Sequence, residues 1–205
     1  MTILLEGVET LPLPVKMPAS VVEMNDDQFF YFCGLNREMQ IERTAEGDIL
    51  INPPSGSLTG QRSAKITTQL ALWGERDGTG VVLGCSAGYM LSNRAVRSPD
   101  ASWLLKSRLK RFSKEEREKF LPLCPDFVIE LKSPTDRLAD LKNKMMEYIE
   151  NGARLGWLLD PEARQVFVYR PGRAVEALDR PEAVSGDPEL PGFVLDLKGI
   201  WEPES

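Results

Sequence analysis

The feature that most constrains the fold is a short apolar segment that carries one acid. Residues 127–131 read FVIEL and lie between Pro125 and Pro134, a pattern typical of a buried strand. Side chains alternate between the two faces of a strand, so Glu130 and Lys132 share a face and stand about 7 Å apart. An acid and an amine are costly to bury on such a strand unless they form an ion pair or hold a metal. The segment therefore predicts a core strand with a charged pair.

The order of the expected elements indicates the fold class. Helices are expected over 25–34, 57–73, 108–120 and 136–151, where apolar residues follow a helical period or a capping residue begins the segment. Short apolar segments between them predict strands at 39–43, 49–51, 81–83, 87–91, 98–105, 154–159, 165–169 and 190–195. Strands in the middle with helices on each side predict an α/β (α+β mixed) fold with a mixed central sheet flanked by helices.

The expected domain organisation is simple. Residues 1–24 contain three prolines and no clear period, so we expect an extended N-terminal arm that can include one short edge strand. Residues 25–205 contain no repeat and no linker, and they are expected to form a single domain.

Composition excludes several kinds of site. The chain has no histidine, which excludes Ser-His-Asp and Cys-His catalysis and any zinc site that uses histidine. A general base must therefore be Asp, Glu, Lys, Tyr or a metal-bound water. Cys33, Cys85 and Cys124 show no metal-ligand spacing, and there is no signal sequence or membrane-spanning segment, so a cytoplasmic protein is expected. The net charge of −6 argues against a general nucleic-acid coat protein, although a local basic patch can still steer DNA.

Three charged residues form a candidate catalytic set. Asp100 follows Pro99 at the start of an expected strand, and Glu130 and Lys132 lie on another strand. Carboxylates from neighbouring strands could hold one or two Mg²⁺ (or Mn²⁺) ions, because hard cations prefer oxygen ligands. A metal-bound water is a nucleophile at neutral pH, and a nearby lysine can orient it or stabilise charge on a phosphate. These residue types are suited to cutting a phosphodiester without histidine.

A longer stretch of sequence resembles a known family. The motif Pro-Asp, a gap, then Glu-x-Lys resembles the PD-(D/E)XK nuclease superfamily. The segments SPDASW at 98–103, CPDFVIELKSP at 124–134, K-x-x-E-Y-x-x-x-G at 144–152 and WLLDP at 157–161 resemble the bacterial restriction-endonuclease family filed as domain of unknown function 820. The resemblance extends from about residue 25 to Trp201. It implies a restriction-endonuclease-like core and a Mg²⁺-dependent endonuclease that hydrolyses DNA.

The resemblance also implies roles for individual residues. Asp100 and Glu130 would be metal ligands together with the backbone carbonyl of Leu131, and Lys132 would be the catalytic lysine. Lys144 and Tyr148 occupy the place where some members carry Gln and Tyr, so Lys144 departs from the pattern. An additional N-terminal acid and a polar residue on the first core helix often join such sites. The candidates are Glu46 or Asp48 for the acid and Gln61 or Gln69 for the polar residue.

Other interpretations of these residues remain open. Glu-x-Lys can be an ordinary ion pair on a strand, Asp126 can bind a backbone amide, and Asp160 can belong to a turn. The fold can also serve as a non-catalytic binding or scaffold module, or as a hydrolase of small phosphate esters. A local excess of basic residues can grip DNA or form a solvated helix face. The candidates for phosphate contacts are Arg94, Arg97, Lys106, Arg108, Lys110 and Arg111. Cleavage of both DNA strands usually needs two active sites, so a homodimer is expected.

Overall fold

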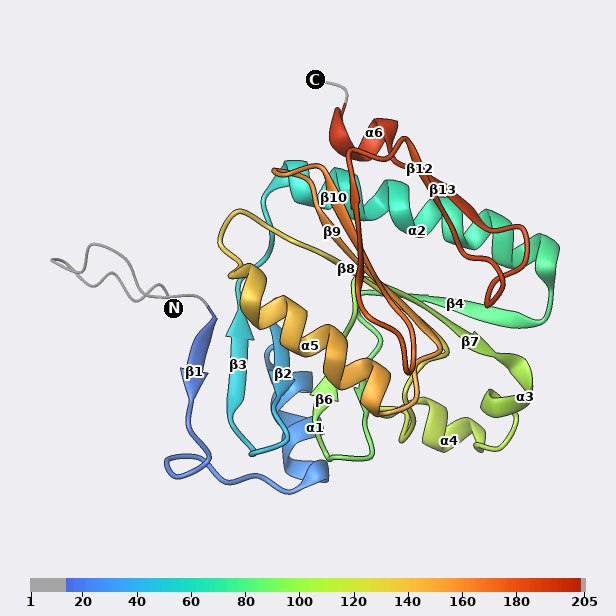
Figure 1. The fold of residues 1–205 in the computed structure, drawn as a ribbon. Coiled ribbons are helices and arrows are strands. Elements are labelled where there is room, and N and C mark those ends of the chain that lie inside the picture. Colours follow the sequence, from blue (N-terminus) through green and yellow to red (C-terminus); the bar gives the residue numbers. More distant parts are fainter. Residues whose placement is uncertain (1–13, 204–205) are drawn as a thin grey trace, which may run out of the picture.

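The computed structural model describes residues 14–203, and its centre is a mixed six-stranded sheet (Figure 1). The strand order is β11-β10-β9-β8-β7-β4, and within this sheet the β8–β9 pair is parallel while the other pairs are antiparallel. The bounds are β4 (Gly80–Gly84), β7 (Ala101–Leu105), β8 (Phe127–Leu131), β9 (Leu155–Asp160), β10 (Gln165–Tyr169) and β11 (Glu176–Asp179). Helix α5 (Leu138–Glu150) joins β8 to β9, which is the crossover that a parallel pair requires.

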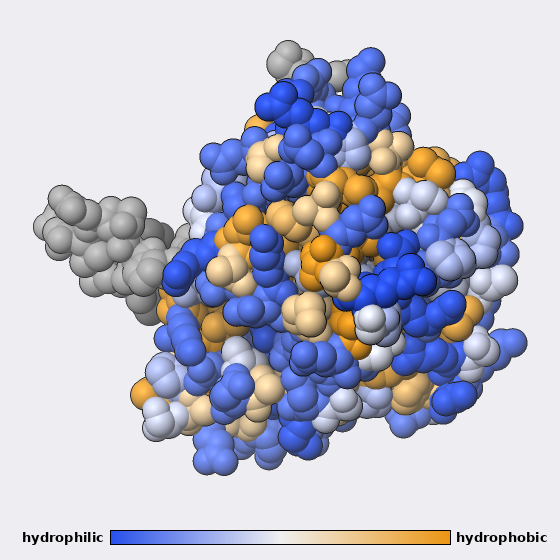
Figure 2. All heavy atoms as spheres, viewed as in Figure 1, coloured by the Kyte–Doolittle hydropathy of each residue, from blue (hydrophilic) through white to orange (hydrophobic). Residues whose placement is uncertain are grey.

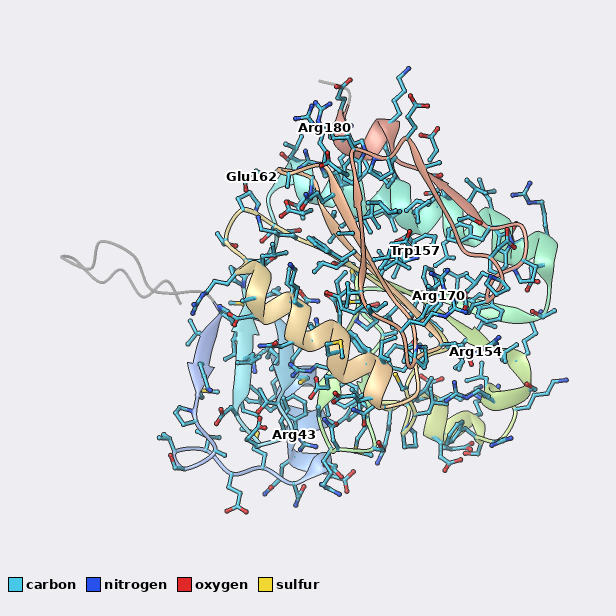
Figure 3. All side chains as sticks on the ribbon, in the orientation of Figure 1. Arg43, Arg154, Trp157, Glu162, Arg170 and Arg180 are labelled. Carbon is cyan, nitrogen blue, oxygen red and sulfur yellow. The ribbon has the colours of Figure 1, made fainter. Side chains whose placement is uncertain are left out.

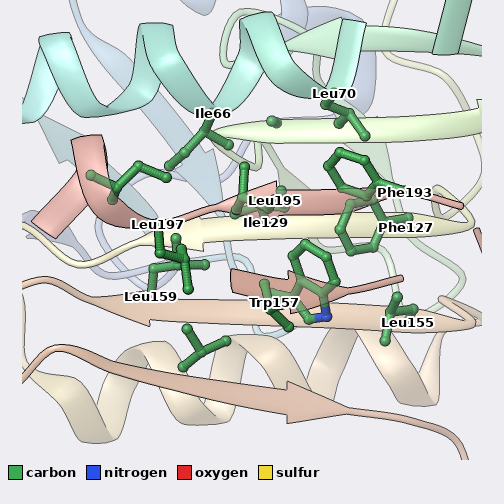
Figure 4. Packing of buried hydrophobic residues seen from close by; sticks show 14 of the residues in the cluster. Ile66, Leu70, Phe127, Ile129, Leu155, Trp157, Leu159, Phe193, Leu195 and Leu197 are labelled. Atoms are coloured by element: carbon green, nitrogen blue, oxygen red, sulfur yellow. The ribbon is translucent and has the colours of Figure 1, made fainter. Parts of the chain in front are cut away.

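The two faces of this sheet pack against different helices. Helix α2 (Ser57–Asp77) covers one face, where Ile66 and Leu70 join Phe127, Ile129 and Trp157 in the larger core cluster (Figure 4). On the other face α5 packs over the sheet, and its buried residues share a second cluster with those strands. Because side chains on β8 alternate, the apolar residues at odd positions face α2 and the residue at 130 faces α5.

A second, antiparallel sheet lies beside the first and has the order β1-β3-β2-β6-β5. Its strands are β1 (Val15–Met17), β2 (Gln40–Arg43), β3 (Ile49–Asn52), β5 (Tyr89–Met90) and β6 (Val96–Arg97). Helix α1 (Asp26–Leu35) packs on it through Phe29 and begins at a capping box, in which Asn25 and Gln28 bind each other's backbone N–H. The expected edge strand in the N-terminal arm is confirmed as β1, while residues 1–13 lie outside the described part of the chain.

The C-terminal residues pack against α2 and complete the larger core cluster. Strands β12 (Ala183–Ser185) and β13 (Val194–Asp196) form a hairpin, and α6 (Lys198–Trp201) follows. Phe193 stacks on Trp157 with ring centroids 5.5 Å apart, which ties this tail to the central sheet. Hydrophilic residues cover most of the face shown in Figure 2, and apolar residues gather near its centre. None of the helices among residues 14–203 is long and apolar enough to cross a membrane.

The mixed α/β fold expected from the sequence is confirmed, and two expected elements need correction. The helix predicted over 108–120 is instead two short helices, α3 (Lys106–Leu109) and α4 (Lys114–Arg117). Ser113 begins the second helix with the predicted capping box to Glu116, so the same residue that favours a helix also interrupts a longer one. The late strand predicted over 190–195 is shorter, because Leu190 and Phe193 pack into the core around a turn before β13.

Candidate active site

Strands β7 and β8 bring two acids opposite each other. Ala101 pairs with Ile129 in the antiparallel register, so continuing by one residue places Asp100 opposite Glu130. Directly opposed residues have side chains on the same face, with Cβ atoms about 5 Å apart. Asp100 Oδ2 accepts a hydrogen bond of 2.7 Å from the backbone N–H of Leu131. The carbonyl of Leu131 points to the same edge of β8 as its N–H, because each strand residue presents both groups to one neighbour.

Helix α5 holds Glu130 in place from above the sheet. The Tyr148 hydroxyl donates to Glu130 Oε1 at 2.9 Å, and Lys144 Nζ lies 2.8 Å from the same oxygen. Lys144 and Tyr148 are four residues apart and therefore lie on one face of the helix. The side chains of Glu130 and Lys144 are only 5% and 13% exposed. The pair expected to support the site thus contacts Glu130 directly.

A third buried acid, Glu42, reaches this cluster from the second sheet, and sequence reasoning missed it. Its Oε1 lies 2.8 Å from Lys144 Nζ and accepts a 2.8 Å hydrogen bond from the N–H of Ser98. Arg97 NH1 lies 3.2 Å from Glu42 Oε2, and Arg97 Nε lies 2.6 Å from Glu147 Oε2. The only local signal for Glu42 is its place between Ile41 and Arg43 on a short strand, a pattern equally typical of a solvent-exposed acid.

The other candidates near the N-terminal strands lie elsewhere, which corrects the expected positions. Asp48 belongs to the β2–β3 turn, where it contacts Lys16 at 2.6 Å and the N–H of Ala19 at 2.9 Å, and Glu46 is exposed in the same turn. Gln61 and Gln69 lie on α2, which covers the sheet face opposite to Glu130. Gln69 binds the backbone of Asp196 on the C-terminal hairpin.

Burial and charge repulsion shift the pKa values of the cluster. Burial raises the pKa of Asp100 to about 6, and repulsion from Asp136 and Glu42 adds to this effect, while the Leu131 N–H and Lys144 oppose it. Burial also raises the pKa of Glu130, with Asp100 and Glu42 contributing repulsion and Lys144 opposing. Burial disfavours the charged form of Lys144, but attraction to Glu130 and Glu42 outweighs it and raises the pKa of this lysine. Glu42 differs from the other two acids, because attraction to Lys144 and Arg97 outweighs the effect of burial and lowers its pKa.

The Lys132 ammonium is engaged by acids at the turn after β9. Its Nζ lies 3.2 Å from Glu162 Oε2 and 3.8 Å from Asp160 Oδ1. Asp160 follows Leu159 in the parallel register with β8 and so stands beside Lys132, and its Oδ1 also accepts the N–H groups of Glu162 and Ala163. Figure 3 labels Glu162 at this turn between β9 and β10. The expected turn role of Asp160 is confirmed, and the turn also holds the lysine.

Among the six basic residues expected to grip phosphate, Arg97 lies within the acidic cluster and the other five lie away from it. Arg97 is buried and engaged by Glu42 and Glu147, and Arg94 is exposed and bound to Asp26. The remaining candidates follow β7 at the end opposite to Asp100, and Lys106, the first of them, is six strand steps or about 20 Å from Asp100, because the five residues of β7 lie between them. They are Lys106, Arg108, Lys110 and Arg111. Arg108 pairs with Asp126 at 3.0 Å, and Asp126 accepts the N–H of Leu105, which confirms the backbone-binding role expected for Asp126.

The donors at this site are compatible with a divalent ion. Across residues 14–203, no group of three or more acidic or cysteine side chains is arranged to hold a metal by itself. Mg²⁺ usually keeps several waters and needs only one or two carboxylates, which Asp100 and Glu130 can supply together with the Leu131 carbonyl. Within the described chain, no hydrogen bond reaches Asp100 Oδ1 or Glu130 Oε2, so each acid retains one oxygen as a ligand.

Comparisons with known proteins identify the family and agree with the fold. The family model Uma2, described as "Putative restriction endonuclease", matches residues 26–198. The crystal structure of a "putative nuclease belonging to DUF820" from Anabaena variabilis has the same fold, with a TM-score of 0.69 and 22% identity over 78% of this chain and 89% of that chain. No curated protein matches the sequence. Because the family model spans most of the chain, this protein belongs to the Uma2 family.

Proposed function

We propose that the protein is a divalent-metal-dependent endonuclease that hydrolyses DNA phosphodiester bonds. The observation that supports this proposal most directly is the placement of Asp100 opposite Glu130, with the Asp100 carboxylate on the N–H of Leu131. Family membership supports nuclease chemistry, and the donor set suits Mg²⁺ or Mn²⁺. DNA is the proposed substrate because the family description names a restriction endonuclease.

In this proposal the residues of the chain have distinct tasks. Asp100, Glu130 and the Leu131 carbonyl would hold the ion, which when bound supplies an activated water and offsets charge on the phosphate. Tyr148 and Lys144 fix the orientation of Glu130 through its Oε1. Lys132 shares a face with Glu130, and rotation of its flexible side chain away from Glu162 would bring the ammonium toward the phosphate. Its contribution is electrostatic stabilisation of the charge that develops on the phosphate oxygens.

Nicking of supercoiled plasmid in Mg²⁺ or Mn²⁺ tests the proposal. We expect Glu130→Gln and Lys132→Ala each to reduce the rate by at least about a hundredfold, because the first removes the charge of a proposed metal ligand and the second removes the ammonium that would stabilise charge on the phosphate. The matched control is Glu176→Gln, which removes an exposed acid on β11 and should leave the rate unchanged. Equal nicking by wild type and both site variants would refute the assignment.

One observation favours a second candidate function, a non-catalytic binding or scaffold module on the same fold. Lys144 already neutralises part of the charge on Glu42 and Glu130, and Lys132 is engaged by Asp160 and Glu162, so the ionic groups can form a purely structural network. Calorimetric titration of the wild type separates the two functions. Absence of Mg²⁺ and Mn²⁺ binding at millimolar concentration favours the module.

We further propose that residues 25–205 act as a single nuclease-like domain behind an N-terminal arm of residues 1–24. Two copies are proposed to assemble as a homodimer on DNA, since a duplex has two strands to cut and two-fold symmetry presents one site to each. Sedimentation of the protein with and without a DNA duplex tests the assembly. A strictly monomeric complex would exclude the dimer and leave the single-strand chemistry in place.

A further inference from the structure

The Lys144 ammonium lies between two carboxylates, in the position that a bridging metal ion would occupy. Its Nζ lies 2.8 Å from Glu42 Oε1 and 2.8 Å from Glu130 Oε1, so one ammonium contacts an oxygen from each sheet. The two acids come from β2 and β8, and the lysine comes from α5, which packs on the central sheet. Both acids are 5% exposed and the lysine is 13% exposed. Two buried carboxylates that share one cation in this way also form a typical position for a divalent ion.

The charge of the cluster limits how many ions it can take. Five carboxylates lie in or beside it (Glu42, Asp100, Glu130, Asp136 and Glu147), and two cations lie among them (Arg97 and Lys144). The net charge is therefore −3 when all seven groups are ionised. One divalent ion reduces this charge to −1, whereas a second would leave an excess of +1 in a largely buried site, which is unfavourable.

The carboxylate oxygens define two possible positions for an ion, one between Asp100 and Glu130 and one between Glu42 and Glu130. The Lys144 ammonium and the Tyr148 hydroxyl both use Glu130 Oε1. Within residues 14–203, Glu130 Oε2 and Asp100 Oδ1 receive no hydrogen bond, so these two oxygens remain for an ion between β7 and β8. Glu42 Oε1 is already occupied by Lys144 and the Ser98 N–H, and its Oε2 faces Arg97. Glu42 is therefore bound by protein cations on both oxygens.

We infer that Lys144 is a built-in second cation, so that each chain binds one divalent ion, at Asp100 and Glu130, and excludes a second from Glu42 and Glu130. This inference rests on the proposed metal-dependent function. Lys144 acts as a positioning residue: it sets the stoichiometry of metal binding and orients Glu130. Its replacement by an uncharged side chain should open the second position.

Titration of the metal-free protein with Mn²⁺, followed by calorimetry and by the loss of the free-ion electron paramagnetic resonance signal, tests the stoichiometry. We expect wild type to bind one Mn²⁺ and Lys144→Met to bind two. The matched control is Lys142→Met, which removes a cation from the same helix where it lies over the Phe167 ring, 4.1 Å from the centroid. This control should still bind one ion with the wild-type affinity.

Glu42→Gln provides a second variant that keeps the Lys144–Glu130 contact, so the result does not depend on how well Lys144→Met folds. If Glu42 is held by protein cations, this variant should bind one Mn²⁺ within about tenfold of the wild-type Kd. Glu130→Gln, in contrast, should weaken binding by at least about a hundredfold.

The outcomes separate this inference from the proposed function. Two ions on wild type, or loss of the single ion in Glu42→Gln, would overturn the role of Lys144 while leaving a metal-dependent nuclease intact. One ion in a folded Lys144→Met protein would overturn it as well. Failure of wild type to bind any Mn²⁺ would instead overturn the proposed function, and with it the inference.

Discussion

The raised pKa of Asp100 predicts that removing its charge stabilises the protein. Burial raises this pKa to about 6, against 3.8 for an aspartate in the unfolded chain. One pKa unit corresponds to about 1.4 kcal/mol, so the ionised carboxylate costs the folded state about 3 kcal/mol above pH 6. Asn at this position keeps an oxygen that can accept the Leu131 N–H and removes only the charge. Asp100→Asn should therefore be more stable than wild type at neutral pH.

The sign of the pH dependence follows from the direction of the shift. Below about pH 4 the carboxyl is protonated in both folded and unfolded states and has no effect on stability. Between pH 4 and 6 the unfolded chain ionises first, so wild type loses stability, and above pH 6 the full penalty is present. The advantage of Asp100→Asn should thus grow from about zero at pH 4 to about 3 kcal/mol at pH 7.5. For a chain of this size that corresponds to a rise in Tm of about 6–12 °C.

Urea unfolding followed by circular dichroism, in metal-free buffer at several pH values, measures this difference directly. The matched control is Asp179→Asn on the exposed β11 strand, which changes the same chemical group away from the cluster. Its stability should differ from that of wild type by less than about 0.5 kcal/mol across the range. If Asp100→Asn is less stable than wild type at pH 7.5, or if its gain in free energy of unfolding does not change with pH, the ionised Asp100 carboxylate does not destabilise the folded protein.

Two further predictions concern the groups that shape the site. Tyr148→Phe should lower the free energy of unfolding by about 1.5–3 kcal/mol, because it removes a buried hydrogen bond to the charged Glu130, whereas Tyr31→Phe at an exposed position should have almost no effect in the same chemical denaturation assay. Gly80→Ala should lower Tm by several degrees in calorimetry, because a Cβ there would lie 2.2 Å from the Trp103 ring; an unchanged Tm would mean that the ring can shift freely.

The local elements were largely predictable because each has a strong local signal. Short stretches of sequence are enough to identify the apolar stripe of α5 and the apolar segments of β8, β9 and β10. The structure of residues 106–120 was not predictable in this way. A capping box at Ser113 begins a new short helix, and Leu109 and Phe112 pack against the core individually and not as a continuous helical stripe. Local propensity favours a helix there, and the Ser113 capping box together with tertiary packing decides where it breaks.

The candidate site was predictable where its residues lie on the β7–β8 pair or on α5, which follows β8 in the chain. The spacing of Glu130 and Lys132 and the Pro-Asp motif at 100 place these residues on neighbouring strands, and the register of β7 and β8 brings Asp100 and Glu130 together. The direction of the Lys132 ammonium was not predictable, because it depends on the turn at Glu162, which lies on another strand connection. Side-chain direction at a site depends on neighbours that are distant in the chain.

Glu42 could not be predicted as a site residue, because it belongs to a different sheet from Asp100 and Glu130. A residue on β2 meets residues on β8 and α5 only because two separate sheets pack at an edge, and no local pattern encodes that meeting. Burial and mutual repulsion raise the pKa values of Asp100 and Glu130, whereas attraction to Lys144 and Arg97 outweighs burial and lowers the pKa of Glu42. A fold that needed only stability would replace such acids by apolar residues, often with a gain in stability. The proposed ligand of charge +2 would account for the presence of these acids beside one bridging lysine, and Mn²⁺ titration tests that account.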